Sequence, residues 1–336
     1  MVHFIVRRVL QMAVALLVLS VLLFAWLRSL PGGPASALLG ERGTPAARER
    51  LIEQLGLNEP LYVQYWRFME RVLQGDFGVS NGVRPGQDAL ELFFDRLPAT
   101  VELSIFAMII ALSAAIPLGY IAARRRGGWL DTSSVIGSLV GVAVPVFFLA
   151  FVLKYIFAIR WGLLPPSGRQ TAGIDATHIT NFYVLDGIIT QEWDAAWDAF
   201  KHLILPAFAL ASIPFAVIFR ITRASVIDVM DEDYVRTARA KGLTSETIRN
   251  RHIMRNALIP VVTIVGLQIG ALLAGAVLTE SVFAFQGIGQ ALALAFEKKD
   301  YPVLQVLIMM AAMIYIVVNL MVDIAYAVID PRVRTK

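Results

Sequence analysis

The sequence predicts an all-α polytopic membrane protein with six transmembrane helices. Hydrophobic residues make up 57% of the 336 residues and only 17% are charged, which is far from the balance of a soluble domain. A charge at the centre of a spanning helix costs about 2.5–3.5 kcal/mol, so spans are kept free of charge. Six windows without Asp, Glu, Lys or Arg approach the roughly 20 residues that cross a bilayer core. They are 9–27, 103–123, 132–153, 202–219, 256–279 and 301–322.

The first window allows two interpretations. Arg7 and Arg8 precede an apolar run, as they would in a signal peptide. The run is longer than an ordinary signal core, however, and it continues through 27–31 without a small-x-small cleavage site. We therefore expect residues 1–30 to form an uncleaved first transmembrane helix.

The long segment 31–99 between the first two windows is predicted to be external and to contain short amphipathic helices. Thr44 and Pro45 suit an N-cap and a first helical turn. A second helix is expected after Pro60, because apolar residues recur there at helical spacing: Leu61, Tyr65, Phe68, Met69 and Val72. Such a stripe indicates packing against the membrane helices rather than a ligand site.

Lys and Arg in the short flanks predict the orientation, because these residues are retained on the cytoplasmic side. If the six helices alternate, four basic clusters fall on one side. The clusters are Arg7 and Arg8, then Arg124 to Arg126, then the seven cations of 223–256, then Arg332, Arg334 and Lys336. We expect a multi-pass cell (inner) membrane protein with a core domain over 100–330, both termini in the cytoplasm and a cytoplasmic tail at 331–336.

Segment 223–256 is the longest predicted cytoplasmic loop, and its residues favour a helix-turn-helix elbow. Acidic residues at 231–233 suit a helix N-terminus, and Gly242 suits the left-handed residue that ends a helix. These signals predict a helix over 232–241. Thr244 then suits the N-cap of a second helix over 245–255.

Periodicity leaves three interpretations of this elbow. It is a solvated linker, a docking surface, or a nucleic-acid-binding motif. Small residues at Ala238 and Ala240 would permit close approach of another body, and Tyr234 and Val235 would add apolar contact. Seven Lys and Arg against five Asp and Glu leave a net charge of only +2, which is poor for phosphate binding. We therefore expect no nucleic-acid partner.

Sequence motifs along nearly the whole chain resemble one family of membrane subunits. The loop sequence EDYVRTARAKGL at 232–243, followed by RHIMRNALIP at 251–260, resembles the EAA-type loop of binding-protein-dependent ABC importers, and most of all the dipeptide/oligopeptide (peptide/nickel) permease family. Other stretches that carry the likeness are LPGGPASALLGERG (30–43), LGLNEPLYVQYWRF (55–68), GDFGVS (75–80), KHLILPAFAL (201–210), TESVFAFQGIG (279–289), KKDYPVLQ (298–305) and VDIAYAVIDPRVR (322–334).

The resemblance implies the ABC type I importer fold and a role for the loop in coupling to an ATPase. The positions that match the family loop are Asp233, Tyr234, Arg236, Ala238, Arg239, Ala240, Lys241 and Gly242. The implied partners are a second homologous permease subunit, two ATP-binding cassette subunits that use ATP and Mg, an extracytoplasmic solute-binding protein and membrane lipid. The implied substrates are dipeptides or oligopeptides, although relatives also carry nickel chelates, glutathione and other small solutes.

The sequence departs from the family pattern at two positions. Asp233 stands where the broader pattern prefers glutamate, which keeps the charge and changes its reach. Gln286 stands where the turn before the last helix usually has proline, so the backbone angle that proline fixes is not imposed there.

The residues that catalysis would need are missing from the sequence. There is no GxxxxGK[ST] loop, so ATP hydrolysis is expected in separate subunits and no cofactor is expected in this chain. There is no HExxH, the chain has no cysteine, and the four histidines are dispersed, so we expect no metal site and no catalytic residue. GIGQAL at 287–292 lacks the third glycine of a dinucleotide loop.

A few residues in or near the predicted spans have structural interpretations. Lys154 and Asp323 near helix ends indicate capping or snorkelling more than substrate contact. GxxxG spacings at Gly137/Gly141 and Gly266/Gly270 favour packing within the subunit. Bends are expected at Pro145, Pro206 and Pro214. The resulting hypothesis is an importer permease subunit; the alternative is an autonomous secondary transporter or channel, which predicts charged or broken helix centres and needs no ATPase. A membrane enzyme is disfavoured by the absence of catalytic groups.

Overall fold

The computed structural model describes residues 2–29, 44–54, 56–174 and 176–329. Within these ranges the regular elements are helices, as predicted, and an isolated antiparallel bridge joins Val79 to Asp88. The motif at 30–43, the tail at 331–336 and the last basic cluster lie outside the described residues. The helices separate into two compact units, residues 1–100 with 286–317 and residues 101–285 with 318–336.

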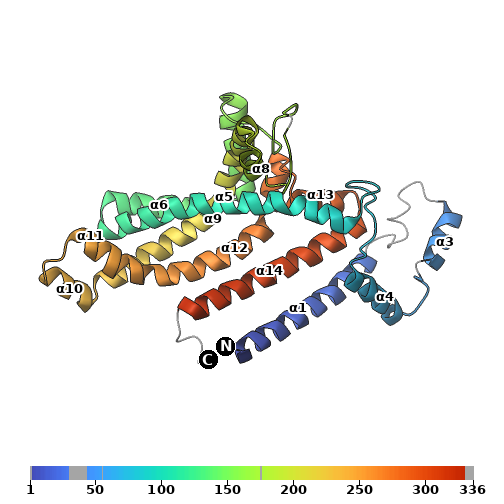
Figure 1. The fold of residues 1–336 in the computed structure, drawn as a ribbon, viewed down its shortest axis with the longest axis horizontal. Coiled ribbons are helices and arrows are strands. Elements are labelled where there is room, and N and C mark those ends of the chain that lie inside the picture. The colour runs from blue at the N-terminus through green and yellow to red at the C-terminus, as the bar shows by residue number, and fades with distance from the viewer. Residues whose placement is uncertain (1, 30–43, 55, 175, 330–336) are drawn as a thin grey trace. The chain divides into compact units, whose positions relative to one another are not determined.

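Five helices in the described part of the chain are long and apolar enough to span a membrane. They are α1 (Val2–Ser29), α5 (Ala89–Arg124), α9 (Trp193–Met230), α12 (Arg255–Phe283) and α14 (Tyr301–Ile329) (Figure 1). Each contains one of the predicted windows. Helix α5 begins 14 residues before its window, because its first turns are amphipathic and pack in the first unit, with Leu92 and Phe93 fully buried.

The remaining window, 132–153, is broken rather than continuous. Helix α6 (Trp129–Ala143) is followed by α7 (Val146–Leu153) and a π-helical turn, η2 (Lys154–Arg160), and the two parts meet at 102°. Pro145 has no N–H to donate and disfavours helical geometry at the preceding residue. Val144 is accordingly extended, with φ −78° and ψ 123°. The bend expected at Pro145 is therefore a full break, whereas Pro206 and Pro214 lie inside the uninterrupted α9.

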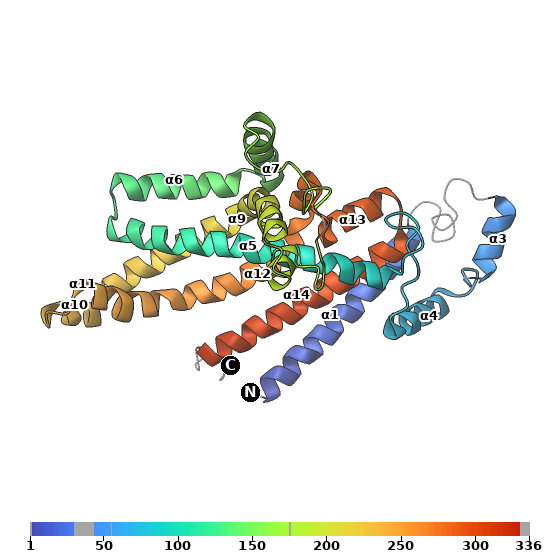
Figure 2. The ribbon, with the colours of Figure 1, turned by 45° about the horizontal axis from the view of Figure 1, so that its top comes forward.

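In the first unit, α1 packs with α4 (Leu61–Gln74), the start of α5, α13 (Ile288–Glu297) and the first part of α14. Figures 1 and 2 show α1 and α14 side by side. Helix α3 (Pro45–Gln54) begins at Pro45, as the Thr44-Pro45 pair predicts. The stripe on α4 is mostly packed, with Phe68 3% exposed, but Leu61 is 66% exposed, so its expected burial was wrong.

A buried carboxylate also holds a loop in the first unit. Asp300, between α13 and α14, has no exposed surface. Its Oδ2 accepts hydrogen bonds from Ser80 Oγ at 2.6 Å, Gly82 N at 2.8 Å and Val83 N at 2.9 Å. The motifs GDFGVS and KKDYPVLQ, more than 200 residues apart in the chain, are thereby joined by hydrogen bonds.

In the second unit, α9 is the central helix and packs against α6, α7, α12 and α8 (Tyr183–Ile189). Among the glycines of the two GxxxG spacings, Gly266 lies at a close approach between helices and Gly141 at an ordinary contact. A Cβ on Gly266 would overlap Val322 of α14, and one on Gly141 would touch Ser212 of α9 at 3.7 Å. A Cβ on Gly137, in contrast, would meet nothing within 4 Å, so this glycine does not mark a close contact among the described residues.

Candidate functional site

The predicted loop helix is present as α10, Asp233–Ala240, between α9 and the helix that becomes α12. It ends where Gly242 adopts a left-handed φ of +74°. Gly242 N donates to Arg239 O at 3.0 Å and Leu243 N donates to Ala238 O at 3.3 Å, which is the hydrogen-bond pattern of a Schellman motif. The φ angle, rather than space, requires glycine here, because a Cβ would meet nothing within 4 Å.

One face of α10 is buried against the second unit. Val235 is fully buried and Ala238 is 4% exposed. They pack in a cluster with Ala123 of α5, Val226 of α9 and Ala257 of α12. We call this cluster the α10 platform; its other buried members are Ile248 and Ile253. The expectation that Val235 and Ala238 offer contact to an outside body was therefore wrong, because their spacing of three places both on the inner face.

The other face of α10 is exposed. The matched residues on it are Asp233, Tyr234, Arg236, Arg239 and Ala240, and the exposed residues Lys241 and Gly242 follow the helix. Arg236 Nη1 lies 3.4 Å from Asp233 Oδ1, with the two side chains 67% and 96% exposed. Such a pair contributes little to stability. Both side chains are therefore largely exposed to solvent, and their contact is not needed to hold α10 in place.

Tyr234 is 40% exposed and connects α10 to α12. Asn256 Nδ2 donates to the Tyr234 hydroxyl oxygen at 3.0 Å and to His252 O at 3.0 Å. This bond holds the N-terminal turn of α10 against the start of α12. The orientation of α10 is thus set by a side-chain hydrogen bond as well as by the platform.

The second helix of the predicted elbow is the beginning of the fifth membrane helix. Thr244 Oγ1 accepts from Thr247 N at 3.3 Å, which confirms the predicted N-cap. From there α11 (Ser245–Thr247), the π-helical turn η3 (Ile248–Met254) and α12 follow without interruption. The prediction of a separate second helix that ends at residue 255 is therefore wrong. The residues that follow Thr244 are therefore continuous in helical structure with α12.

Asp131, in the first turn of α6, binds Arg223 near the end of α9. Arg223 Nε donates to Oδ1 at 2.5 Å, and Arg223 Nη2 donates to Oδ2 at 2.7 Å. Gly127 N, in the α5–α6 turn, donates to the same Oδ2 at 3.0 Å. Asp131 is 4% exposed. This carboxylate therefore joins α6 and the α5–α6 turn to α9, ten residues before α10 begins.

A second buried ion pair lies in the segment between η2 and α9. Arg169 Nη2 donates to Glu102 Oε2 of α5 at 2.9 Å, and both side chains are 5% exposed. Arg169 also donates to Asn181 O at 2.6 Å, and its guanidinium lies 3.7 Å from the centre of the Tyr183 ring. Sequence reasoning missed this pair. The one available signal was Glu102 itself, an acid at the edge of an apolar window.

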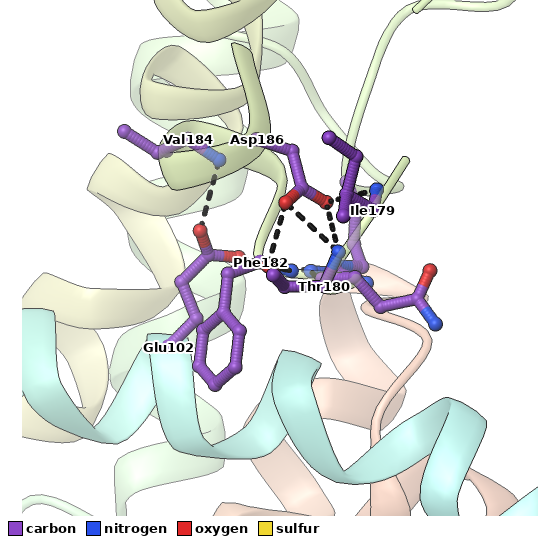
Figure 3. Close-up of polar contacts among 8 residues, drawn as sticks. Glu102, Ile179, Thr180, Phe182, Val184 and Asp186 are labelled. Carbon is purple, nitrogen blue, oxygen red and sulfur yellow. Dashed lines mark hydrogen bonds and ion pairs between the residues drawn. The ribbon is translucent and has the colours of Figure 1, made fainter. Parts of the chain in front are cut away.

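Backbone donors complete the attachment of this segment (Figure 3). Val184 N donates to Glu102 Oε1 at 3.0 Å. Asp186, which has no exposed surface, accepts from Thr180 Oγ1 at 2.6 Å and from the N–H groups of Ile179 and Thr180. The carboxylates of Glu102 and Asp186 therefore hold Arg169 and residues 179–186 in place beside α5.

Two other residues singled out from the sequence have structural explanations. Lys154 Nζ donates to Val282 O at 2.8 Å, one residue before α12 ends, which confirms the predicted capping role. Gln286 is exposed between α12 and α13. The chain turns there because Ala284 takes the left-handed conformation at φ +47° and Phe285 N donates to Glu280 O at 2.8 Å, so the turn forms without proline.

Comparisons with known proteins cover the whole length of the chain. Residues 115–335 match the family described as binding-protein-dependent transport system inner membrane component. Residues 1–104 match the N-terminal part described for the membrane components of such systems. The helical fold and the matched ranges define a multi-pass inner membrane component of a transport system. The chain belongs to the binding-protein-dependent transport system inner membrane component family, and it has the type I fold of ABC importer permeases.

Similar proteins extend this assignment. The chain is 42% identical to a dipeptide transport system permease protein of Alkalihalophilus pseudofirmus, over 99% of this chain and 100% of that protein. It is 41% identical to a dipeptide transport system permease protein of Escherichia coli (strain K12), over 100% of both. It is 36% identical to an oligopeptide transport system permease protein of Bacillus subtilis (strain 168), over 99% and 100%. Family membership thus favours the importer permease over the autonomous transporter or channel.

Proposed function

We propose that this chain is a permease subunit of a peptide importer, with dipeptides or short oligopeptides as substrates. The names of full-length relatives at 36–42% identity support this substrate class. The chain pairs with a second, homologous permease subunit and receives peptide from an extracytoplasmic solute-binding protein. ATP and Mg are used by two separate ATP-binding cassette subunits, and this chain supplies half of the membrane pathway.

The coupling element in this proposal is α10, seated in a groove of an ATPase subunit in the cytoplasm. The observation that carries this assignment is the division of α10 into a buried face on the platform and an exposed, charged face. A helix that is free to tilt would absorb motion of the partner, whereas one packed on α5, α9 and α12 transmits it. A pathway with two conformations shifts from a population ratio of 1:99 to 99:1 when a partner binds one conformation more tightly than the other by about 5.5 kcal/mol.

The matched loop residues have two different roles in this proposal. Ala238 allows α10 to lie close to its own membrane helices, and Gly242 turns the chain toward Thr244. The exposed residues Arg236, Arg239 and Lys241 meet acidic groups of the ATPase. Asp233, Tyr234 and Ala240 complete the contact surface. Both termini then lie in the cytoplasm, together with the α5–α6 turn.

Crosslinking of single cysteines tests the position of α10. The chain contains no cysteine of its own, so Ala240→Cys and Lys241→Cys introduce unique thiols on the exposed face. We expect both to crosslink to an ATPase subunit in the assembled importer. Asn81→Cys, exposed in the predicted external segment, is the matched control and should react only with a reagent added outside the cell. Crosslinking of Asn81→Cys to the ATPase, or external labelling of Ala240→Cys, would contradict the proposal.

Uptake assays test the substrate class separately. The importer is reconstituted with both permeases, both ATPase subunits and its binding protein, and is supplied with dipeptides, longer peptides, glutathione or a nickel chelate. We expect ATP-dependent accumulation of peptides. Accumulation of the nickel chelate alone would overturn the peptide assignment while leaving the role of α10 intact.

A further inference from the structure

Helix α4 carries an exposed apolar stripe beside its packed face. Tyr62 is 76% exposed, Trp66 is 73% exposed and Leu73 is 82% exposed. At 100° per residue these three positions lie within about 40° of one another around the helix. They form a continuous strip on a helix whose other apolar face is already buried. We call these three residues the α4 stripe.

The remaining exposed surface of α4 is charged or polar, except for Leu61 in the first turn, which is 66% exposed. Arg67, Glu70, Arg71 and Gln74 are exposed and lie on the side away from the packed residues. Around its axis, α4 therefore has a face packed on α1, an apolar exposed strip next to it, and a polar side. This arrangement is typical of a helix lying in the plane of a membrane surface.

Contacts with α1 give the depth of α4. The Phe24 ring lies 5.2 Å from the Tyr65 ring and 5.7 Å from the Phe68 ring, measured between centroids. Arg28 Nε donates to Gln64 Oε1 at 2.9 Å, and Ser20 Oγ lies 2.8 Å from the Tyr65 hydroxyl. Helix α4 is thus held against the last turns of α1, near the level of Phe24. Figure 1 shows the two ribbons next to each other.

The length of the α1 span gives the depth of Phe24 in the bilayer. The candidate span Val6–Ser29 has 24 residues, with a charge-free part at 9–27. The whole span extends about 36 Å at 1.5 Å per residue, against a hydrocarbon core of about 30 Å. Phe24 is five residues before Ser29, or about 7 Å along the axis. It therefore lies a few ångströms inside the core boundary, where an amphipathic helix inserts its apolar face.

We propose that the α4 stripe is a lipid-binding surface, inserted at the boundary between headgroups and acyl chains of the leaflet in which α1 ends. Trp and Tyr suit this position because their rings are apolar and their N–H and O–H groups remain in contact with headgroups and water. Arg67 and Arg71 on the polar side face the headgroup and water layer. The occupant is bilayer lipid, and the inference depends only on α1 crossing the membrane.

Spin labelling in the assembled importer tests the proposal. Four variants each carry a single cysteine in this cysteine-free chain. Trp66→Cys is compared with its neighbour Arg67→Cys, and Leu73→Cys is compared with its neighbour Gln74→Cys. After nitroxide labelling and reconstitution into bilayers, collision rates are measured with oxygen, which concentrates in lipid, and with a water-soluble nickel chelate. We expect the oxygen-to-nickel ratio to be severalfold higher at 66 and 73 than at 67 and 74.

Two results would overturn the proposal. Equal ratios at both members of each pair would place the α4 stripe in water. Exclusion of both reagents at 66 and 73 would show that a protein covers the stripe, either the second permease or the binding protein. All four side chains are exposed and lie outside the packed face of α4. A local structural change caused by one substitution would therefore affect one pair and not both.

Discussion

Arg223 binds both carboxylate oxygens of Asp131, and the two residues are 92 positions apart in the chain. The pair belongs to the same unit as α10 and lies close to it in the chain, because Arg223 of α9 precedes the first residue of α10 by ten positions. It joins α6 and the α5–α6 turn to the helices of the α10 platform. Motion of α10 is therefore expected to carry α6 with it.

Removal of the Asp131 charge is expected to destabilise the protein and weaken coupling. Loss of one partner from a buried ion pair lowers the free energy of unfolding by about 3–5 kcal/mol. Because Arg223 is 26% exposed, we expect the loss in Asp131→Asn to be about 3 kcal/mol or less. Thermal unfolding in detergent and the number of ATP molecules hydrolysed per peptide imported measure the two effects.

Asp231→Asn is the matched control for Asp131→Asn, since Asp231 is an exposed acid just before α10. It should change the midpoint of unfolding little. The double change Asp131→Asn with Arg223→Gln should cost less than the sum of the single changes. Strict additivity would show that the pair does not act as a unit.

Substitutions of two alanines on α10 test protein stability and ATPase docking separately. Ala238 is buried in the α10 platform, so Ala238→Leu overpacks it and is expected to cost about 1–3 kcal/mol. Ala240 is exposed, so Ala240→Leu should leave the unfolding midpoint near that of the parent while reducing the amount of ATPase subunit that co-purifies. Equal loss of stability in both variants would contradict the observed division of faces.

The left-handed turn at Gly242 predicts a graded series of variants. A β-branched residue is strained at φ +74°, by about 1–3 kcal/mol, so Gly242→Val should disrupt the Schellman motif and lower peptide uptake per ATP hydrolysed. Gly242→Asn should be milder, because asparagine tolerates this conformation. Uptake by Gly242→Val equal to that of the parent would show that the turn is not needed for coupling.

The pair of Glu102 and Arg169 is expected to hold Arg169 and residues 179–186 against α5. Glu102→Ala leaves a buried guanidinium unpaired and removes the acceptor of Val184 N, so we expect a loss of about 3–5 kcal/mol and faster proteolysis between η2 and α9. Asp194→Ala, at an exposed acid on α9, is the control. Proteolysis at the parental rate in Glu102→Ala would show that the remaining contacts suffice.

The sequence by itself determined the helical class, the five predicted windows that lie in single long helices, and the ends of α10 to within one residue. These features depend on local signals: charge-free windows, the acids at 231–233, Thr244 as a cap and Gly242 as a turn. Each acts within a few residues, so no knowledge of the fold is needed to see it. The break at Pro145 is of the same kind, although its angle is not encoded locally.

Only the tertiary structure decided which face of α10 turns inward and which charges meet. Ala238 and Ala240 are equally small in the sequence, and packing on Ala123, Val226 and Ala257 buries one and exposes the other. Glu102 and Arg169 are 67 residues apart, and Asp131 and Arg223 are 92 apart. Such pairs form because packed helices bring them together, and a pattern of period 3.6 along one helix contains no information about the charge on its neighbour.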